Sequence, residues 1–197
     1  ISLDTLQKER FLLMTKRDLF TTVHDNIHLA MDRGIRMKVN VVVMKGINDE
    51  EILDFIRWTR DQPIQVRFIE FMPFDGNRWD SHRVFTLQEM IDRISASFDI
   101  QSTYSQPHET AKNFSINGHK GSFAVISTMS APFCSDCNRL RLDSDGNIYG
   151  CLSSNHPIGL HETDDEAALI SKLQQAMEQK RTLRFTGSDL SMLKIGG

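Results

Sequence analysis

Cysteine is scarce in this sequence of 197 residues, which contains only three. An odd and clustered set of thiols argues against the paired disulfides of a small secreted protein and favours a reducing compartment. Long apolar runs are missing as well: none approaches the about 18–20 residues that span a bilayer, and no signal peptide is visible. The sequence therefore predicts a cytoplasmic protein without a membrane partner.

A strong charge of either sign is also absent, because the formal net charge is −3. Such a balance gives the chain no overall attraction to nucleic acid or to an anionic membrane. Any site for an anion must therefore be local. Apolar residues make up 40% and charged residues 25% of the chain, which is typical of a globular protein with a core.

Strand-like and helix-like patterns alternate in the first part of the chain. The spacing of apolar residues between 20 and 31 predicts a helix that ends at Gly34. The near-continuous apolar run at 36–44 predicts a strand covered on both faces, and a second strand is expected at 64–72. This alternation predicts parallel strands joined by crossover helices.

Three helix starts are predicted from the pattern of a capping box, in which an N-cap residue is followed three positions later by an acidic residue. The pairs are Asn48 with Glu51, Thr86 with Glu89, and Thr163 with Glu166.

The pattern changes after residue 73, where a polar and turn-rich segment begins. Short strands are expected at 98–104, 112–116 and 121–128, and Asp145-Gly146 predicts a hairpin. We therefore expect an α/β region over residues 1–80 and an α+β region over residues 81–197.

All three cysteines, Cys134, Cys137 and Cys151, lie on either side of the predicted hairpin, which would fold the third toward the other two. Three thiolates suit a soft metal or an iron–sulfur cluster, and on a four-iron cluster they would leave one iron open. A zinc site completed by His156 or His161 is one alternative. Three unrelated buried thiols are the other.

Several cationic and apolar residues are candidates for ligand contacts. Arg139 and Arg141 lie two apart on a predicted strand and so share a face, where they would suit a phosphate-bearing ligand or form a solvated surface. Lys38, inside a predicted strand, must reach an opening or an acidic partner. Met72 would pack in the core or contact a ligand at a strand end.

Several motifs together carry a resemblance to a known family. In order along the chain, they are SLDTL, TKRD, KVNVVVMKGINDEE, RFIEFMP, FCSDCNRLRLDSDGNIYGCL and a terminal IGG. The chain resembles the GTP 3′,8-cyclases, which are radical S-adenosylmethionine enzymes of molybdenum cofactor biosynthesis. The resemblance covers essentially the whole chain, although Lys16 stands where the family usually has glycine.

The resemblance implies a fold and a place within the enzyme. The family has a partial (β/α) TIM-like barrel followed by a C-terminal region. Residues 1–80 would form the second part of the barrel, and residues 81–197 the C-terminal region with its cysteine cluster site. The family's CxxxCxxC motif is absent here. A first [4Fe–4S] cluster would therefore lie on an N-terminal part outside this chain, and the chain alone is expected to be inactive.

The resemblance also assigns roles to individual residues. Cys134, Cys137 and Cys151 would hold a second [4Fe–4S] cluster, whose open iron binds the guanine part of GTP. Ser2 and Met72 would contact S-adenosylmethionine. The expected GTP-binding residues are Lys38, Arg139, Leu140 and Arg141. The expected catalytic residues are Gly196 and Gly197, at the end of a tail that reaches into the active site.

The implied reaction is a radical cyclisation. A radical derived from S-adenosylmethionine takes hydrogen from C3′ of GTP, and C3′ then attacks guanine C8 to give (8S)-3′,8-cyclo-7,8-dihydroguanosine 5′-triphosphate. A cyclic pyranopterin monophosphate synthase would use this product, and family members often form homodimers. The competing hypothesis is a zinc-stabilised module that binds a nucleotide or a protein without catalysis.

Overall fold

The computed structural model describes residues 1–161, 165–182 and 185–192. The chain divides by its contacts into two compact units. Unit 1 consists of Ile1–Phe71 and His82–Ala131, and unit 2 consists of Met72–Ser81 and Pro132–Gly197.

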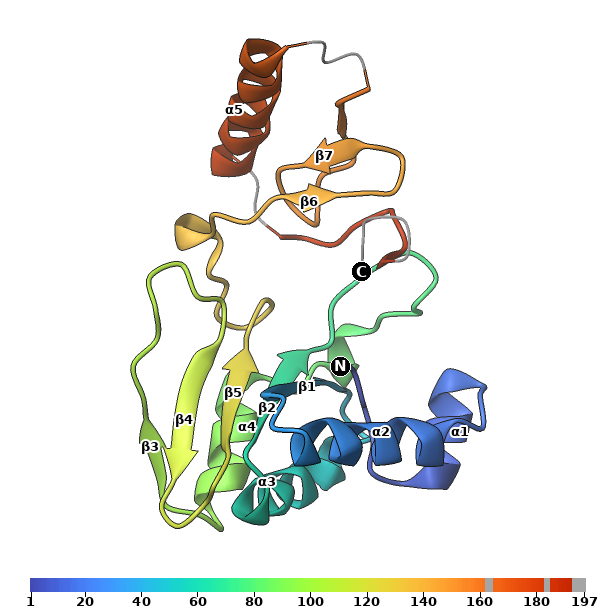
Figure 1. Cartoon of the computed structure of the whole chain (residues 1–197), viewed down its shortest axis with the longest axis vertical. Coiled ribbons are helices and arrows are strands. Elements are labelled where there is room, and N and C mark those ends of the chain that lie inside the picture. Colours follow the sequence, from blue (N-terminus) through green and yellow to red (C-terminus); the bar gives the residue numbers. More distant parts are fainter. Residues whose placement is uncertain (162–164, 183–184, 193–197) are drawn as a thin grey trace. The chain divides into compact units, whose positions relative to one another are not determined.

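A five-stranded sheet forms the centre of unit 1, with the strand order β1-β2-β5-β4-β3 (Figure 1). Its strands are β1 (Met37–Val43), β2 (Ile64–Glu70), β3 (Ile100–Ser102), β4 (Lys112–Ile116) and β5 (Ser122–Ile126). β1, β2 and β5 are parallel, whereas β4 is antiparallel to both β5 and β3. The predicted parallel pair is confirmed, because helix α3 (Ile52–Asp61) connects β1 to β2.

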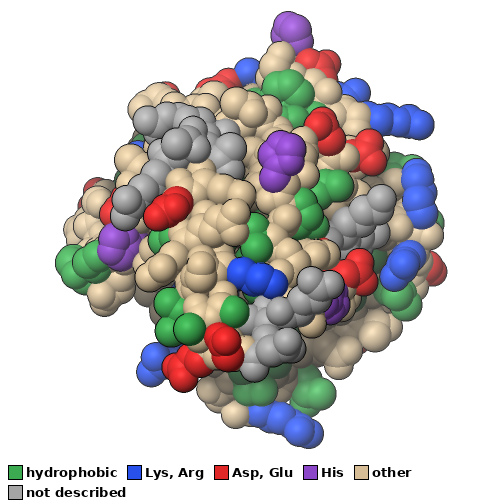
Figure 2. Space-filling view, turned by 90° about the horizontal axis from the view of Figure 1, so that it is seen from above, with side chains coloured by type: hydrophobic (Ala, Val, Ile, Leu, Met, Phe, Trp, Pro, Cys, Tyr) green, Lys and Arg blue, Asp and Glu red, His purple; other side chains and the backbone are tan. Residues whose placement is uncertain are grey.

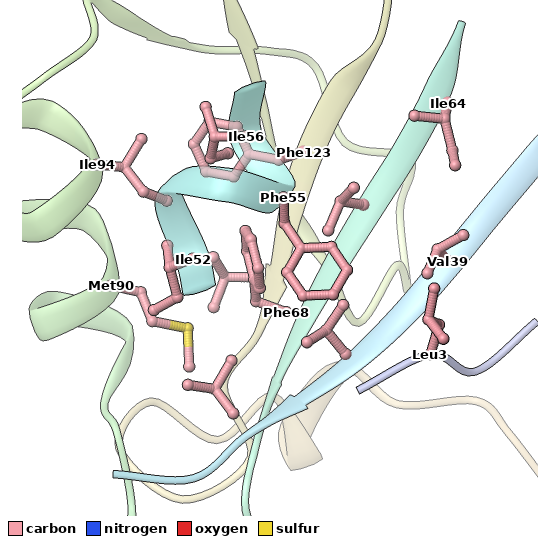
Figure 3. Close-up of a cluster of buried hydrophobic side chains, with 14 of the residues drawn as sticks. Leu3, Val39, Ile52, Phe55, Ile56, Ile64, Phe68, Met90, Ile94 and Phe123 are labelled. Atoms are coloured by element: carbon pink, nitrogen blue, oxygen red, sulfur yellow. The ribbon is translucent and has the colours of Figure 1, made fainter. Parts of the chain in front are cut away.

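Helices pack against this sheet to form the core of unit 1 (Figure 1). They are α1 (Lys8–Thr15), α2 (Phe20–Asp32), α3 and α4 (Leu87–Ser95). The predicted helix over 20–31 is confirmed by α2, and Gly34 follows it with a φ of 74°. Facing side chains on neighbouring strands, such as Val39, Val66 and Phe123, lie in the same register and are fully buried. Figure 3 shows Val39 and Phe123 within this cluster of buried side chains.

β1 differs from the strand expected at this position. It lies at an edge of the sheet, where only an isolated bridge between Ser2 and Asn40 adds to it. Its burial alternates, so that Val39 and Val41 are buried while Lys38 is exposed and Asn40 is half-buried. The prediction of a strand covered on both faces was therefore wrong, because Val39, Val41 and Val43 fill the buried face, whereas Lys38 and Asn40 lie on the other face with the half-buried Val42.

The three predicted capping boxes have different outcomes. Thr86 accepts from the amide of Glu89, whose carboxylate accepts from the amide of Thr86, so this box begins α4 as predicted. The box of Asn48 and Glu51 was wrong. Asn48 instead bonds to Asp4 and Val42, and Glu51 bonds to Thr5 and Arg10. The third box includes Thr163, which lies outside the described residues.

Unit 2 contains a three-stranded antiparallel sheet in the order β6-β7-β8 and one long helix. Its elements are β6 (Arg141–Leu142), β7 (Asn147–Tyr149), β8 (Ile158–Gly159) and α5 (Glu166–Thr182). The predicted hairpin is confirmed. Asp143 fixes its turn, because its carboxylate accepts from the amides of Asp145 and Asn147 and from the hydroxyl of Tyr149. These bonds, led by the one from Asn147, lower the pKa of Asp143.

The two units divide the chain differently from the boundary expected at residue 80. The predicted strands at 98–104, 112–116 and 121–128 all form, as β3, β4 and β5. They join the sheet of β1 and β2, so that residues 82–131 belong to unit 1. The expected functional domains stay a prediction.

Charged residues of both signs are interspersed on the face shown in Figure 2. This mixed surface is consistent with the small net charge of −3. Within the described ranges, no helix combines the length and the apolar character needed to cross a membrane.

Candidate functional site

A cavity of about 820 Å³ opens in unit 1 at the amino ends of β1, β2 and β5. Four cationic side chains line it: Arg36, Lys38, Arg67 and Lys120. No Asp or Glu is among its lining residues. Four cations without an acidic neighbour in the lining create a positive local potential, which attracts anions despite the net negative charge of the chain.

The register of the sheet explains why polar residues meet at this cavity. Lys38, Gln65 and Ser122 are paired across β1, β2 and β5 and so lie on the same face. Arg67, on the same face of β2, donates from Nε to Oδ1 of Asn40 on β1 at 2.8 Å. The alternation that buries the valines therefore turns Lys38 and Arg67 to the opposite face.

Lys38 is the one predicted substrate-binding residue in this cavity, and it reaches an opening as expected. It is the second residue of β1, so it lies near the amino end of the strand and not at the carboxyl end. Sequence reasoning missed Arg36, Arg67 and Lys120. The pattern that singled out Lys38, a cation inside a predicted strand, is also present at Arg67. Lys120 lies just before β5, so its place in the cavity lining depends on the register of β5.

The first residues of the chain run beside β1. Ser2 forms a parallel bridge with Asn40, and the amide of Leu3 donates to the carbonyl oxygen of Asn40 at 3.0 Å. Ser2 is exposed. The structure thus places Ser2 next to the polar face of β1, in the same unit as Lys38.

Met72 lies in unit 2, just after the end of β2, and is half-buried. Its carbonyl oxygen accepts from Nδ2 of Asn77 at 2.7 Å. Segment 185–189 is attached to the same loop, because Phe74 and Ser188 form a parallel bridge and the rings of Phe74 and Phe185 lie 5.7 Å apart. Gly196 and Gly197 follow this segment but lie outside the described residues.

The three cysteines all lie in unit 2, are half-buried and form no disulfide. Cys134 begins a short 3-10 helix, Cys137 follows it, and Cys151 comes after β7. The amide of Ser153 donates to Sγ of Cys151 at 3.5 Å. Among the residues that the structure describes, no three His, Cys, Asp or Glu side chains converge on one point where they could hold an ion.

This arrangement bears on the cysteine hypotheses in two ways. Three free, half-buried thiols in one unit are a suitable donor set for an iron–sulfur cluster. Among the described residues, the expected convergence of three thiolates is not seen. His156 and His161, the alternative zinc ligands, are both exposed. The His161 ring packs against the backbone of Gly146, where an added Cβ would lie only 2.9 Å from it.

Arg139 is exposed and Arg141 is half-buried at the start of β6, with Leu140 between them. Burial lowers the pKa of Arg141, and the nearby positive charge of Arg139 lowers it further. The two cations are therefore close enough to interact electrostatically. An anion placed beside both would relieve this repulsion.

The cysteine segments are attached to α5 through Lys180. Its ammonium group, largely buried, donates to the carbonyl oxygens of Arg139 at 2.7 Å and Gly150 at 2.9 Å. Arg139 follows Cys137 by two positions, and Gly150 immediately precedes Cys151. Lys180, which sequence reasoning missed, thus connects the backbone near Cys137 with the backbone next to Cys151.

Comparison with known proteins identifies the family. The Molybdenum Cofactor Synthesis C family matches residues 64–185. The chain belongs to this family. It is 41% identical over 210 residues to the mitochondrial GTP 3′,8-cyclase of Arabidopsis thaliana, covering 100% of this chain and 54% of that protein.

Two further relatives show the same pattern of coverage. The GTP 3′,8-cyclase of Staphylococcus haemolyticus is 41% identical over 157 residues, covering 78% of this chain and 46% of that protein. Human molybdenum cofactor biosynthesis protein 1 is 41% identical over 196 residues, covering 98% of this chain and 29% of that protein. This chain thus spans about half the length, or less, of these relatives.

Proposed function

We propose that this chain is the GTP-binding, second-cluster part of a GTP 3′,8-cyclase, with an N-terminal part outside the chain completing the enzyme. Support comes from the family match and from relatives that carry this name. The fold class proposed for residues 1–80 is the second part of a partial TIM-like barrel. The parallel arrangement of β1, β2 and β5 is consistent with it.

The observation that carries the proposal is the cationic cavity of unit 1. GTP is a polyanion, and its binding requires several positive charges close together. Lys38 and the three cations around it meet this requirement. Their role is to hold the triphosphate rigidly, so that the ribose and the base keep a fixed orientation.

Unit 2 would contribute the cluster site and a second set of cations. We assign the cluster to Cys134, Cys137 and Cys151 and further phosphate contacts to Arg139 and Arg141. When bound, a [4Fe–4S] cluster on three thiolates would supply an open iron position for the purine.

The remaining assignments follow from the resemblance. Ser2 and Met72 would contact S-adenosylmethionine, which would supply the radical for hydrogen abstraction. Leu140 would line the GTP site, and Gly196 and Gly197 would enter the active site. A homodimer and a downstream cyclic pyranopterin monophosphate synthase are the proposed partners.

Two measurements on the full chain test the proposal. Anaerobic reconstitution with iron and sulfide should load about four irons per chain. Calorimetry should then show that GTP binds more tightly than guanosine. Lys38→Met should weaken GTP binding by about tenfold or more, since a hydrogen bond to a charged group contributes about 1.5–3 kcal/mol, and should leave guanosine binding unchanged.

Lys112→Met serves as the matched control, because Lys112 is exposed on β4 and does not line the cavity. It should bind GTP like the unmodified chain. Equal affinities for GTP and guanosine would refute the role of the cations. Stoichiometric zinc without iron after anaerobic handling would instead support the zinc-stabilised module.

A further inference from the structure

Two histidines lie one helical turn apart on α2, in unit 1 and outside the cavity described above. His24 and His28 are separated by four positions and therefore share a face of the helix. Their Nε2 atoms are 3.3 Å apart, and both rings are partly buried. Neither residue has a role in the proposed function.

The separation of the two nitrogens matches that of a metal chelate. Zinc–imidazole bonds are about 2.0–2.1 Å long, so two such bonds at a tetrahedral angle separate the nitrogens by about 3.3–3.4 Å. Without an ion, one Nε2 must carry a hydrogen and donate to the other. With an ion, both nitrogens would present lone pairs, and little movement of the rings is required.

Neighbouring aromatic rings hold the pair in place. The ring of His24 stacks on Phe20 at 5.5 Å and on Trp58 of α3 at 6.1 Å, and the ring of His28 lies 5.9 Å from Trp58. Side chains that are ordered in advance lose less conformational entropy when they bind.

A carboxylate lies next to the outer nitrogen of one histidine. Nδ1 of His24 is 3.7 Å from Oδ1 of Asp25. Histidines that bind metals usually direct their second nitrogen toward a carboxylate or carbonyl, which fixes the tautomer and makes the ligating nitrogen more basic. Asp25 lies beyond hydrogen-bonding distance here, so it acts on the His24 ring only as a nearby negative charge.

We propose that His24 and His28 form a two-histidine site for a divalent transition-metal ion such as Zn²⁺ or Ni²⁺. The described part of the chain provides no third His, Cys, Asp or Glu at this place. The remaining coordination positions belong to water or to a ligand from another molecule. The site is distinct from the cysteines of unit 2, which offer soft sulfur ligands instead of imidazole.

Tryptophan fluorescence provides a local test, because Trp58 contacts both histidines and the chain contains two tryptophans. In the full chain carrying Trp79→Phe, only Trp58 emits. Ni²⁺, which quenches nearby indole emission, should quench it saturably at submillimolar concentration with one ion per chain. The same ion should raise the midpoint of thermal unfolding, since it binds the folded state.

Two variants in this background distinguish a chelate from weak surface binding. His28→Asn should raise the apparent dissociation constant by about tenfold or more, because the second ligand of a chelate binds at a high effective concentration. Combining His28→Asn with Leu29→His restores the number of histidines but places the second one off the shared face, so it should not restore binding. Leu29 is exposed and tolerates the change.

The proposal is overturned if Ni²⁺ gives no saturable quenching of Trp58. It is also overturned if the Trp79→Phe chain and its two variants show the same apparent dissociation constant for Ni²⁺. The latter result would mean that the ion binds elsewhere, for example at the cysteines.

Discussion

Lys180 and Gly150 are joined by a hydrogen bond of 2.9 Å from the ammonium group of α5 to the carbonyl oxygen that precedes Cys151. The same ammonium group binds the carbonyl oxygen of Arg139. A lysine that is largely buried in this way acts as a fixed connection between two cysteine-bearing segments. The contribution of Lys180 to the free energy of unfolding can be measured by replacing Lys180 while all three cysteines stay unchanged.

Lys180→Met should lower the free energy of unfolding by about 2–3 kcal/mol, because two carbonyl oxygens lose a charged donor. Chemical denaturation measures the change. Lys172→Met on the same helix is the matched control, since the bond from Lys172 to Gly159 is exposed to solvent. Its expected effect is within about 0.5 kcal/mol. Equal effects of the two substitutions would contradict the role of Lys180.

Gly150, immediately after β7, lies close to the backbone of α5. A Cβ at Gly150 would lie 2.4 Å from the carbonyl oxygen of Ala176, so Gly150→Ala should destabilise the chain by about 1–3 kcal/mol. At Gly159, a Cβ would lie 3.6 Å from Asn147, an ordinary contact. Gly159→Ala should therefore melt close to the unmodified chain in thermal unfolding, whereas Gly150→Ala should melt earlier.

Glu70, fully buried at the end of β2, holds the loop that follows β5. Its carboxylate accepts from the amides of Leu87, Met129 and Ser130, at 2.7–2.9 Å. Glu70→Gln would turn an amide group toward these donors and should cost about 2–3 kcal/mol in unfolding free energy.

Glu178→Gln is the control for this substitution, because Glu178 is exposed on α5. It should change the unfolding free energy by less than about 0.5 kcal/mol. A Glu70→Gln chain as stable as this control would show that the carboxylate is dispensable.

Glu89 makes stability depend on pH. Its hydrogen bond with Lys45 and its cap bond to the Thr86 amide lower its pKa from 4.5 to about 2. The unfolded chain binds more protons between these values, so this contribution is complete above about pH 4.5 and is lost as the pH falls toward 2.

Glu89→Gln keeps a side chain that can form a capping box but removes the charge. Denaturation at pH 5 and at pH 3 should therefore show a smaller loss of stability in this variant than in the unmodified chain. Parallel losses in the two proteins would rule out Glu89 as the titrating group.

Features that depend on neighbouring residues were predictable, and features that depend on distant partners were not. The capping box of Thr86 and Glu89 formed because both bonds are made within one helical turn. The similar pair of Asn48 and Glu51 did not, because Thr5, Arg10 and Asp4 provide better partners more than forty positions away. Sequence spacing alone gave no sign of this competition.

The cationic cavity shows the same limit. Lys38 could be singled out as a cation inside a strand, but Arg36, Arg67 and Lys120 come from separate segments that meet only when β1, β2 and β5 align. Their meeting depends on strand order and register, which are set by the buried faces of the strands.

The sequence by itself predicted α2, the start of α4, the strands β1 to β5, the hairpin at Asp145-Gly146 and the family to which the chain is similar. These depend on residue types at short spacing, where local conformational preference acts. Only the tertiary structure decided that residues 98–128 join the first sheet, that Lys38 meets three other cations, and that Lys180 connects the cysteine segments. These contacts are made by segments far apart in the chain, and they form only where burial outweighs the entropy of closing the intervening loops.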